Sequence, residues 1–532
     1  MKRQDSRGRR GLFKISAAVV VAGLALAGCS SSDSGSEASA SSTASASPVS
    51  GGTLTVGRVA AVTSLDPATQ ITANNAFAID KVFESLVSFN ADGEVIPWLA
   101  SDYNISDDGL TYTFTLRDGL KFSDGTDVTP DDVVFSLDRH LKLGDESPLP
   151  LSGPIDSIEA TADNQVTITL TSAYTPLISE LANFSNGIYP ADFGGQSEED
   201  FFKNPVGTGP FVVDEWDPNA DISFTKNTNY WQDGKPYVDK LVYKLVSDDA
   251  QLQQQLQAGQ LDIIDEVPYA NVTELESNAS VNVVTNKSWE IEQVFFNTQN
   301  EYFADEHVRR AVAQAIDRQG IVDAVTFGTA TVANSLIPPT IEYSANDEGY
   351  ALDYDLDSAK QELAQSAYPD GFSVTLSIKS GNSALAQEAQ IVQQSLAEIG
   401  ITVEIESLES ATFSSKVYGD YNYDFMINSG QSDSPDPDGL VSFQADPDGF
   451  SHSYWTFYTN DDVTSLLNEG RETADGDARQ QIYLDIQKIM AEQVPYIPLY
   501  YTSVIKATTS DISGLTVLPN GSMLLQDVSV TD

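Results

Sequence analysis

A serine-rich tract, Ser30–Ser50, divides this chain of 532 residues into a short N-terminal segment and a long body, Gly51–Asp532. The tract contains 11 serines in 21 residues and no aromatic side chain. It cannot bury enough apolar surface to fold, so residues 29–50 are predicted to be a flexible linker that spans roughly 25 Å. The body of about 480 residues is too long for a single hydrophobic core, and we expect it to form two or three domains.

Helical and strand periodicities alternate along the body. Thr111–Leu116 alternates small polar with large apolar residues, as a half-buried strand does. Thr129 can cap a helix whose first position suits Pro130. The interleaving of the two periodicities predicts a mixed α/β fold. Apolar spacing predicts further helices at Val308–Ile316, Ile391–Ile399 and Ile482–Met490, and a further strand at Ile401–Ile405.

The N-terminal segment has the organisation of an export signal. Its basic start is followed by Ala17–Ala27, an apolar stretch too short to span a bilayer. The four residues Leu26–Cys29, LAGC, resemble a bacterial lipobox, in which the cysteine is acylated, and Cys29 is the only cysteine of the chain. We therefore expect residues 1–28 to be a lipoprotein signal peptide and Cys29 to anchor the protein to the outer face of the cell membrane.

The charge and the absent motifs exclude several classes of function. The formal net charge is −50, and removal of residues 1–28 leaves 22 basic against 77 acidic residues, which argues against nucleic-acid binding. The three histidines are scattered, and no zinc-protease, phosphate-loop or serine-hydrolase motif is found. We expect no metal, no cofactor and no enzymatic activity.

The segment Pro97–Leu137 reads PWLASDYNISDDGLTYTFTLRDGLKFSDGTDVTPDDVVFSL. It resembles the signature of the peptide/nickel family of extracellular solute-binding proteins, the receptors of ATP-driven (ABC) importers. Gly207 and Gly209 belong to one of the matching blocks, and we expect them to adopt backbone angles that other residues avoid. The remaining matches occur in the family's order at Leu65–Pro67, Phe83–Leu86, Pro205–Phe211, Lys226–Trp231, Ala258–Ile263, Val308–Arg318, Tyr354–Leu363 and Pro495–Tyr501.

The resemblance implies a bilobal periplasmic-binding-protein fold with a hinge and an additional inserted domain. Such a receptor, expected here to be a monomer, closes around its solute because the ligand makes more contacts in the closed state. Lobe I is expected from residues 51–85, 185–290 and 505–532, the inserted domain from 86–184, and lobe II from 291–504.

The resemblance also implies a position for the ligand's amino group. The loop SGQSDSPDPD, Ser429–Asp438, is similar to the family's loop in which an aspartate three residues before Asp-Pro holds the α-amino group of a peptide, and Asp433 has that position. A carboxylate enclosed by a cleft is costly alone and favourable when an ammonium group pairs with it. The alternative is that Asp433 only caps a turn.

The sequence departs from the peptide binders in two places. Ser429-Gly430 stands where they commonly have Gly-Trp, and no arginine occurs between Gln319 and Gly470 to hold a ligand carboxylate. Lys379 or Lys416 can replace that arginine without its planar fork. An oligopeptide needs no such clamp, because its main chain can pair with the protein backbone. Four aromatic residues are candidates for the pocket, with the core as the alternative: Trp289, Tyr418, Tyr421 and Trp455.

These observations predict a receptor that captures a peptide, in particular an oligopeptide, and delivers it to the permease of an ABC importer. An oligosaccharide, an opine or a nickel chelate is the alternative cargo, although the few histidines argue against nickel. A surface hydrolase and a receptor that signals to a partner are further alternatives.

Overall fold

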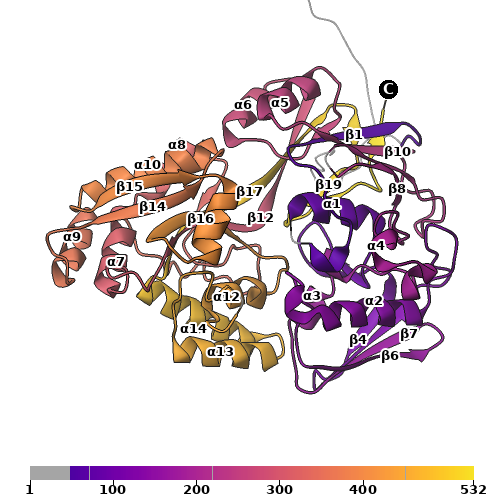
Figure 1. Cartoon of the computed structure of the whole chain (residues 1–532), viewed down its shortest axis with the longest axis horizontal. Coiled ribbons are helices and arrows are strands. Elements are labelled where there is room, and N and C mark those ends of the chain that lie inside the picture. Colours follow the sequence, from indigo (N-terminus) through magenta and orange to yellow (C-terminus); the bar gives the residue numbers. More distant parts are fainter. Residues whose placement is uncertain (1–47, 71, 219, 450, 532) are drawn as a thin grey trace, which may run out of the picture. The chain divides into compact units, whose positions relative to one another are not determined.

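The computed structural model describes residues 48–531 except 71, 219 and 450 (Figure 1). The predicted signal peptide, Cys29 and most of the predicted linker lie outside these residues. The described body is a mixed α/β structure, as predicted. Within it, no helix is both long and apolar enough to cross a membrane.

One large mixed sheet of 11 strands runs through the body. Its two longest strands, β12 (Val281–Phe296) and β17 (Tyr496–Thr509), pair antiparallel at its centre. On one side lie β16 (Phe425–Gln431), β14 (Ser373–Lys379) and β15 (Thr402–Leu408). On the other side lie β11 (Ile263–Ile264), β1 (Thr53–Arg58), β10 (Lys240–Leu245), β9 (Ile222–Lys226) and β8 (Phe211–Trp216), while β13 (Thr331–Val332) pairs with β17.

The two central strands change partners along their length. The first half of β12 pairs with the end of β17, and its second half, Glu290–Phe296, also pairs with β16. Between Lys287 and Ile291 the register shifts, as at a β-bulge. The lobe boundaries predicted at 290/291 and 504/505 fall inside these two strands. We therefore propose that β12 and β17 form the hinge between the lobes.

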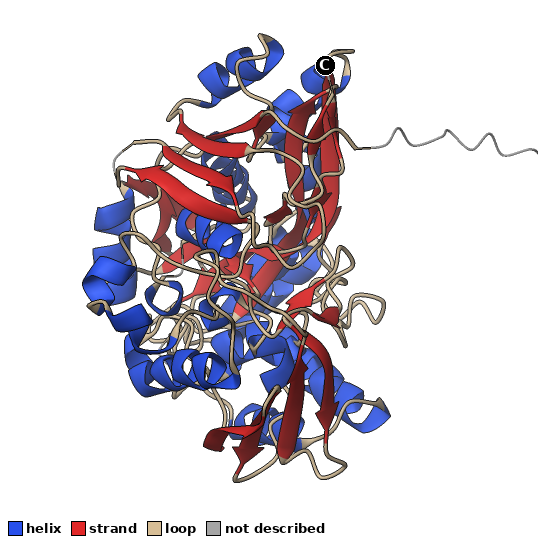
Figure 2. Ribbon diagram, turned by 90° about the vertical axis from the view of Figure 1, so that its right-hand side faces the viewer, coloured by secondary structure: helices blue, strands red, loops and turns tan. Residues whose placement is uncertain are grey.

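A separate four-stranded sheet forms within residues 86–184 (Figure 2). Its order is β4 (Ala100–Ile105), β5 (Thr111–Leu116), β7 (Gln165–Leu170) and β6 (Ile155–Ala162), and β5 is the strand predicted from TYTFTL. Helix α2 (Pro130–Leu143) packs on this sheet. The main-chain N–H of Thr129 donates to the carboxylate of Asp132 at 2.8 Å, which confirms the predicted helix start. The hairpin β2 (Val87–Phe89) and β3 (Val95–Pro97) precedes this sheet.

The helices predicted from apolar spacing are present. They are α7 (Glu306–Ala315), α10 (Ser383–Ala397) and α14 (Asp477–Gln493), and the first two contribute Val312 and Val392 to one core with β14. The other helices are α1 (Ala73–Val82), α3 (Leu177–Glu180), α4 (Glu198–Phe201), α5 (Asp249–Gln257), α6 (Val272–Glu276), α8 (Arg318–Val325), α9 (Leu356–Gln365), α11 (Ser410–Phe413), α12 (Pro437–Ala445) and α13 (Asp461–Glu472). Two short ladders near the C-terminus pair β18 (Ile512–Ser513) with β21 (Ser529–Val530) and β19 (Thr516–Val517) with β20 (Met523–Leu524).

Gly207 and Gly209 are required for a different reason from the one predicted. Neither lies in the left-handed region of backbone space. Instead, a Cβ on Gly207 would lie 2.0 Å from the carbonyl oxygen of Val82, and one on Gly209 would lie 2.5 Å from that of Lys81. The two glycines let the chain pass directly against the end of α1, so the constraint is space and not φ.

Candidate functional site

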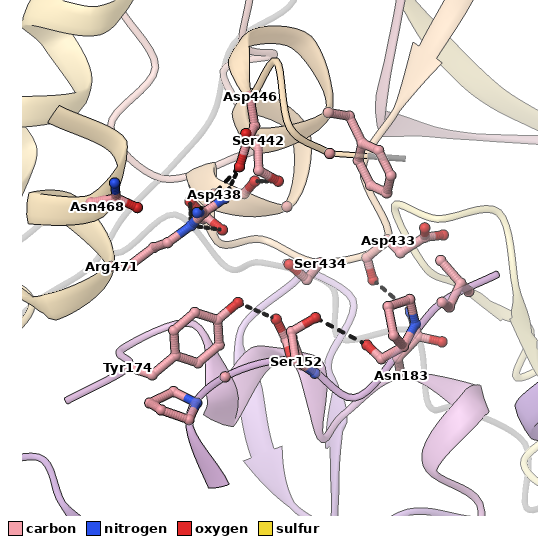
Figure 3. A pocket seen from close by; sticks show the side chains of 18 of the residues that line it. Ser152, Tyr174, Asn183, Asp433, Ser434, Asp438, Ser442, Asp446, Asn468 and Arg471 are labelled. Atoms are coloured by element: carbon pink, nitrogen blue, oxygen red, sulfur yellow. Dashed lines mark hydrogen bonds and ion pairs between the residues drawn. The ribbon is translucent and has the colours of Figure 1, made fainter. Parts of the chain in front are cut away.

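A cavity of about 630 Å³ lies between residues 149–186, at the end of the predicted inserted domain and the start of the next lobe I segment, and residues 433–472 of the predicted lobe II (Figure 3). Tyr174, Ser152 and Asn183 face Asp433 and Asp438 across it. Its volume is in the range of pockets that hold small organic ligands. Asp433 also lines a second, smaller cavity of about 60 Å³ beside Phe77 and Asp80 of α1. The predicted amine-binding residue therefore lies where two cavities meet.

The loop that carries Asp433 is held by its neighbours. It begins where β16 ends, and there the N–H of Ser432 donates to the carbonyl of Trp289 at 3.1 Å. It ends at Asp436, whose carboxylate caps α12 and accepts a hydrogen bond from the guanidinium of Arg479 at 2.8 Å. Arg479 is completely buried. These contacts fix the backbone on both sides of Asp433.

The carboxylate of Asp433 has no partner within the described part of the chain. Only its main-chain oxygen is bonded, at 3.4 Å from the side-chain nitrogen of Asn183. The side chain is half-buried, and burial raises the pKa of Asp433 to about 6. The turn bonds of this loop come from Ser432 and Asp436 and not from Asp433, so the structure does not support the turn-cap alternative.

The cavity lining is strongly acidic. Its acidic members are Glu180, Asp433, Asp438, Asp446, Asp448 and Glu472, and Arg471 is its one basic residue. Arg471 is already ion-paired within this lining, since its guanidinium lies 3.0 Å from Asp438 and 3.3 Å from Asp446. Burial raises the pKa of Glu180, which accepts a hydrogen bond from Tyr174 at 2.6 Å, to about 7. An electropositive group on a ligand is therefore favoured here.

Two of the predicted aromatic residues lie together. Tyr418 stacks on Trp455 with ring centroids 4.0 Å apart, and Asn428 of β16 donates to the Tyr418 hydroxyl at 3.0 Å. The ammonium group of Lys379 lies 5.6 Å from the centre of the Tyr418 ring. Lys416 is ion-paired with Glu406, whereas Lys379 has no ion pair among the described residues. Of the two lysines proposed to replace the missing arginine, Lys379 is the one left free.

The other two predicted aromatic residues lie elsewhere. Trp289 is fully buried in the core, edge-on to Phe89 with centroids 5.1 Å apart, and this corrects its assignment to the pocket. Its side chain fills the core where β12 meets the β2–β3 hairpin. Tyr421 packs edge-on against Phe457 at 4.9 Å, and within the described residues no hydrogen bond or ring contact joins it to Asp433 or Tyr418.

The residues that the inserted segment contributes to the cavity were not predicted from the sequence. Tyr174 and Asn183 are more than 200 positions from Asp433, and neither belongs to a motif. Arg471 had a weak signal, because it is the first arginine after the long stretch without one. Its position in the lining was not predictable, since it depends on how α13 packs against α12.

Residues 94–452 match the family of bacterial extracellular solute-binding proteins, family 5. The chain belongs to this family. The resemblance seen in the sequence is thereby confirmed, as is the bilobal fold of periplasmic binding proteins. The family consists of extracytoplasmic solute-binding proteins and not of enzymes.

Several relatives cover nearly the whole chain. The glutathione-binding protein GsiB of Salmonella typhi is 28% identical over 483 residues, covering 88% of this chain and 92% of that protein. The heme-binding protein A of Haemophilus influenzae is 29% identical over 549 residues, covering 97% and 99%. The structure is similar to that of the ABC transporter-associated periplasmic binding protein DppA from Helicobacter pylori in complex with the peptide STSA, with a TM-score of 0.80, 28% identity, and coverage of 91% of this chain and 99% of that one.

Proposed function

We propose that this solute-binding protein captures a peptide and delivers it to the permease of an ABC importer. The observation that carries the proposal is the half-buried, unpaired carboxylate of Asp433 at the junction of two cavities. A peptide's α-amino group would pair with it and remove the cost of burying a lone charge. The similar structure from Helicobacter pylori, which holds a peptide, supports this choice of cargo.

The other end of the ligand has a candidate partner as well. Lys379 ends β14 beside the Tyr418–Trp455 stack, and its ammonium group forms no ion pair among the described residues. We propose that Lys379 attracts the ligand's carboxylate, as a point charge and without the two parallel bonds of an arginine. A ligand longer than a dipeptide would gain further affinity from main-chain pairing.

The test compares peptides that differ only at the amino end. The mature protein is titrated with pools of two- to eight-residue peptides, either free or N-acetylated, and the thermal midpoint and binding heat are measured. Free peptides are expected to raise the midpoint, whereas acetylated peptides and the Asp433→Asn variant are expected to give no shift. Equal binding of free and acetylated peptides would contradict the role of Asp433.

The alternative cargoes enter the same screen. Oligosaccharides, opines and nickel chelates are titrated beside the peptides, and native mass spectrometry of the purified protein identifies any ligand kept from the host. A shift with one of these solutes and with no peptide would reject the peptide assignment while leaving the receptor role intact. Release of cleaved peptide from the complex would reject a purely binding role.

We also propose that acylated Cys29 holds the receptor on the membrane. The chain has no other cysteine, so a lipid thioether can form at only one place. The Cys29→Ser variant is expected to leave the membrane fraction and to lose incorporation of labelled palmitate. Retention of Cys29→Ser in washed membranes would exclude this anchor.

A further inference from the structure

Three glutamates from two elements, Glu290 and Glu292 of β12 and Glu388 of α10, lie together beside the central strands. Glu290 and Glu292 are two positions apart in β12, so their side chains leave the same face of the sheet. Tyr500 lies opposite Glu292 in the β12–β17 ladder. Its hydroxyl donates to Glu388 of α10 at 2.5 Å. This contact brings the α10 carboxylate to the face that carries Glu290 and Glu292.

Two carboxylate oxygens of this group are buried without a hydrogen bond. Glu388 is 1% exposed, and its Oε2 has no partner among the described residues. Glu292 has the same deficit at Oε1. No hydrogen bond joins the two carboxyl groups in the described structure, so they do not satisfy each other. Enclosed acceptors of this kind are costly unless a donor reaches them.

The titratable groups around the three glutamates do not balance their negative charge. The titratable neighbours are Glu266 and Tyr269 from the segment after β11, Tyr500 from β17, and Lys379 from β14. Lys379 is the one cation of this set, and it forms no ion pair in the described residues. Burial raises the pKa of both carboxyl groups, and repulsion from Glu388 raises that of Glu292 further. A second cation would relieve this repulsion.

The group lies beside the strand that leads to Asp433. In the β12–β16 ladder, Glu290 pairs with Gln431 and Glu292 pairs with Ser429, so the glutamates lie beside the strand that leads to Asp433. Tyr454 interacts electrostatically with both Asp433 and Glu290, and its hydroxyl lies 3.5 Å from the carbonyl of Ser429. An extended peptide places side chains of one side about 7 Å apart, so a ligand that starts at Asp433 can reach the glutamates within its first few residues.

We propose that Glu290, Glu292 and Glu388 form a subsite for a basic side chain of the ligand, so that the receptor prefers peptides that contain lysine or arginine. The inference rests on the proposed function and adds the class of peptide. The ammonium or guanidinium group would donate to the two unpaired oxygens, and charge-assisted bonds of this kind are the stronger ones. Glu290, which already accepts from Ser429 and Thr502, would add negative charge and not a direct bond.

The test uses alanine tripeptides that carry either lysine or its neutral analogue norleucine at position one, two or three. Binding is measured by calorimetry near pH 7.5, where the amino groups and the carboxylate of the free peptide are charged. At one position the lysine peptide is expected to bind at least about tenfold more tightly than the norleucine peptide. Glu292→Gln is expected to remove this preference and to keep the norleucine peptide within about threefold of its original affinity.

Two further variants keep the test independent of folding defects. Glu388→Gln is expected to act like Glu292→Gln, and thermal melts verify that each variant folds. Glu404→Gln, on an exposed position of β15, is the matched control and should change neither affinity. Equal affinities for lysine and norleucine at all three positions would overturn the subsite, as would a lysine preference that survives in both glutamate variants.

The outcomes also separate this inference from the proposed function. If norleucine peptides bind through Asp433 and lysine adds nothing, the peptide receptor stands and the subsite is rejected. If no tripeptide binds but 1,5-diaminopentane does, and Glu292→Gln abolishes that binding, the acidic subsite stands and the peptide assignment is rejected. If neither binds, both are rejected.

Discussion

The carboxyl group of Asp433 is buried at a cost in free energy, because no group among the described residues pairs with it. Its neighbours in the loop, Ser432 and Asp436, use their side chains to hold the backbone, whereas Asp433 leaves its carboxylate unbonded within the described residues. Because burial disfavours the charged form, the unliganded protein bears a cost that an ammonium group would remove. This balance leads to two predictions.

Peptide affinity is expected to have an optimum between about pH 6 and pH 8. Below about 6, the pKa to which burial raises Asp433, the free carboxyl group is protonated and cannot attract an ammonium group. Above about 8, a peptide's α-amino group loses its proton. Calorimetry across this range measures the profile. If affinity did not fall as the pH is lowered through about 6, or fell in the same way in Asp433→Asn, Asp433 would not be the group that binds the amine.

The Asp433→Asn substitution is expected to stabilise the unliganded protein at about pH 8 by on the order of 1–2 kcal/mol. A carboxyl group with a raised folded-state pKa destabilises the fold once pH exceeds its unfolded pKa, and the full cost is reached above the folded pKa. The stabilisation by Asp433→Asn should decrease toward zero as the pH falls below about 4, where the carboxyl group is protonated in both the folded and the unfolded protein. Urea titrations at both pH values measure it, and a loss of stability at the higher pH would contradict the unpaired charge.

At the scale of elements, the start of α12 depends on α14. Arg479 of α14 is completely buried, donates to Asp436 at 2.8 Å, and also bonds the carbonyl of Gly470 at 2.9 Å. Arg479 acts on the site indirectly. It holds Asp436, the N-cap of α12, which is three residues from Asp433 in the same loop. The geometry of the site therefore depends on a contact that lies outside the cavity.

Arg479→Met is expected to lower the free energy of unfolding by about 3–5 kcal/mol, because it leaves Asp436 buried without its counter-ion. Peptide affinity should fall with it, while the pH of half-maximal binding should stay the same. The control is Arg310→Met, which removes a half-exposed pair with Glu362 and should cost about 1 kcal/mol or less. Equal costs for the two variants would contradict this account.

Gly207 lies directly against the last residue of α1, Val82, and this close packing leads to a steric prediction. Gly207→Ala is expected to destabilise the protein by about 2–4 kcal/mol, because the new methyl group would lie 2.0 Å from the carbonyl oxygen of Val82. Gly419→Ala is the matched control, since the nearest atom to its added Cβ is 3.9 Å away and its φ is not positive. Thermal melts compare the two. A neutral Gly207→Ala would show that the backbone there can move apart.

For the whole body, the proposed hinge in β12 and β17 predicts how the two lobes would move. β12 and β17 are the strands that pass between the predicted lobes in the large sheet, and a register shift interrupts them near Ile291. A bend at that point would change the distance between α5 and β15 with little change inside either lobe. The cavity lined by Asp433 and Tyr174 would then close or open.

Peptide binding is expected to shorten the distance between spin labels placed at Gln257→Cys in α5 and Glu404→Cys in β15, both at exposed positions. The labels are specific in a Cys29→Ser background, because the chain has no other cysteine. Pulsed dipolar spectroscopy measures the distance with and without peptide. Identical distributions with a saturating peptide would exclude closure about β12 and β17.

Local chemistry made parts of this structure predictable. The start of α2 follows from Thr129, Pro130 and Asp132, and α7 and α10 follow from apolar spacing, because caps and helical faces depend on residues within a few positions of one another. Asp433 was proposed as a binding residue from its place in a loop motif, and that role stays a prediction. Trp289 was misplaced, because sequence cannot show that the β2–β3 hairpin covers its side of β12.

The α/β class, the family and the proposals for Cys29 and Asp433 follow from the sequence alone, since each depends on neighbouring residues or on ordered motifs. Only the tertiary structure placed Tyr174 and Arg471 around one cavity, and only it brought Glu388 to the face of β12 beside Glu292. Tyr500 and Glu388 are 112 positions apart in the chain. Which distant charges meet is decided by strand register and helix packing, and these depend on the whole core.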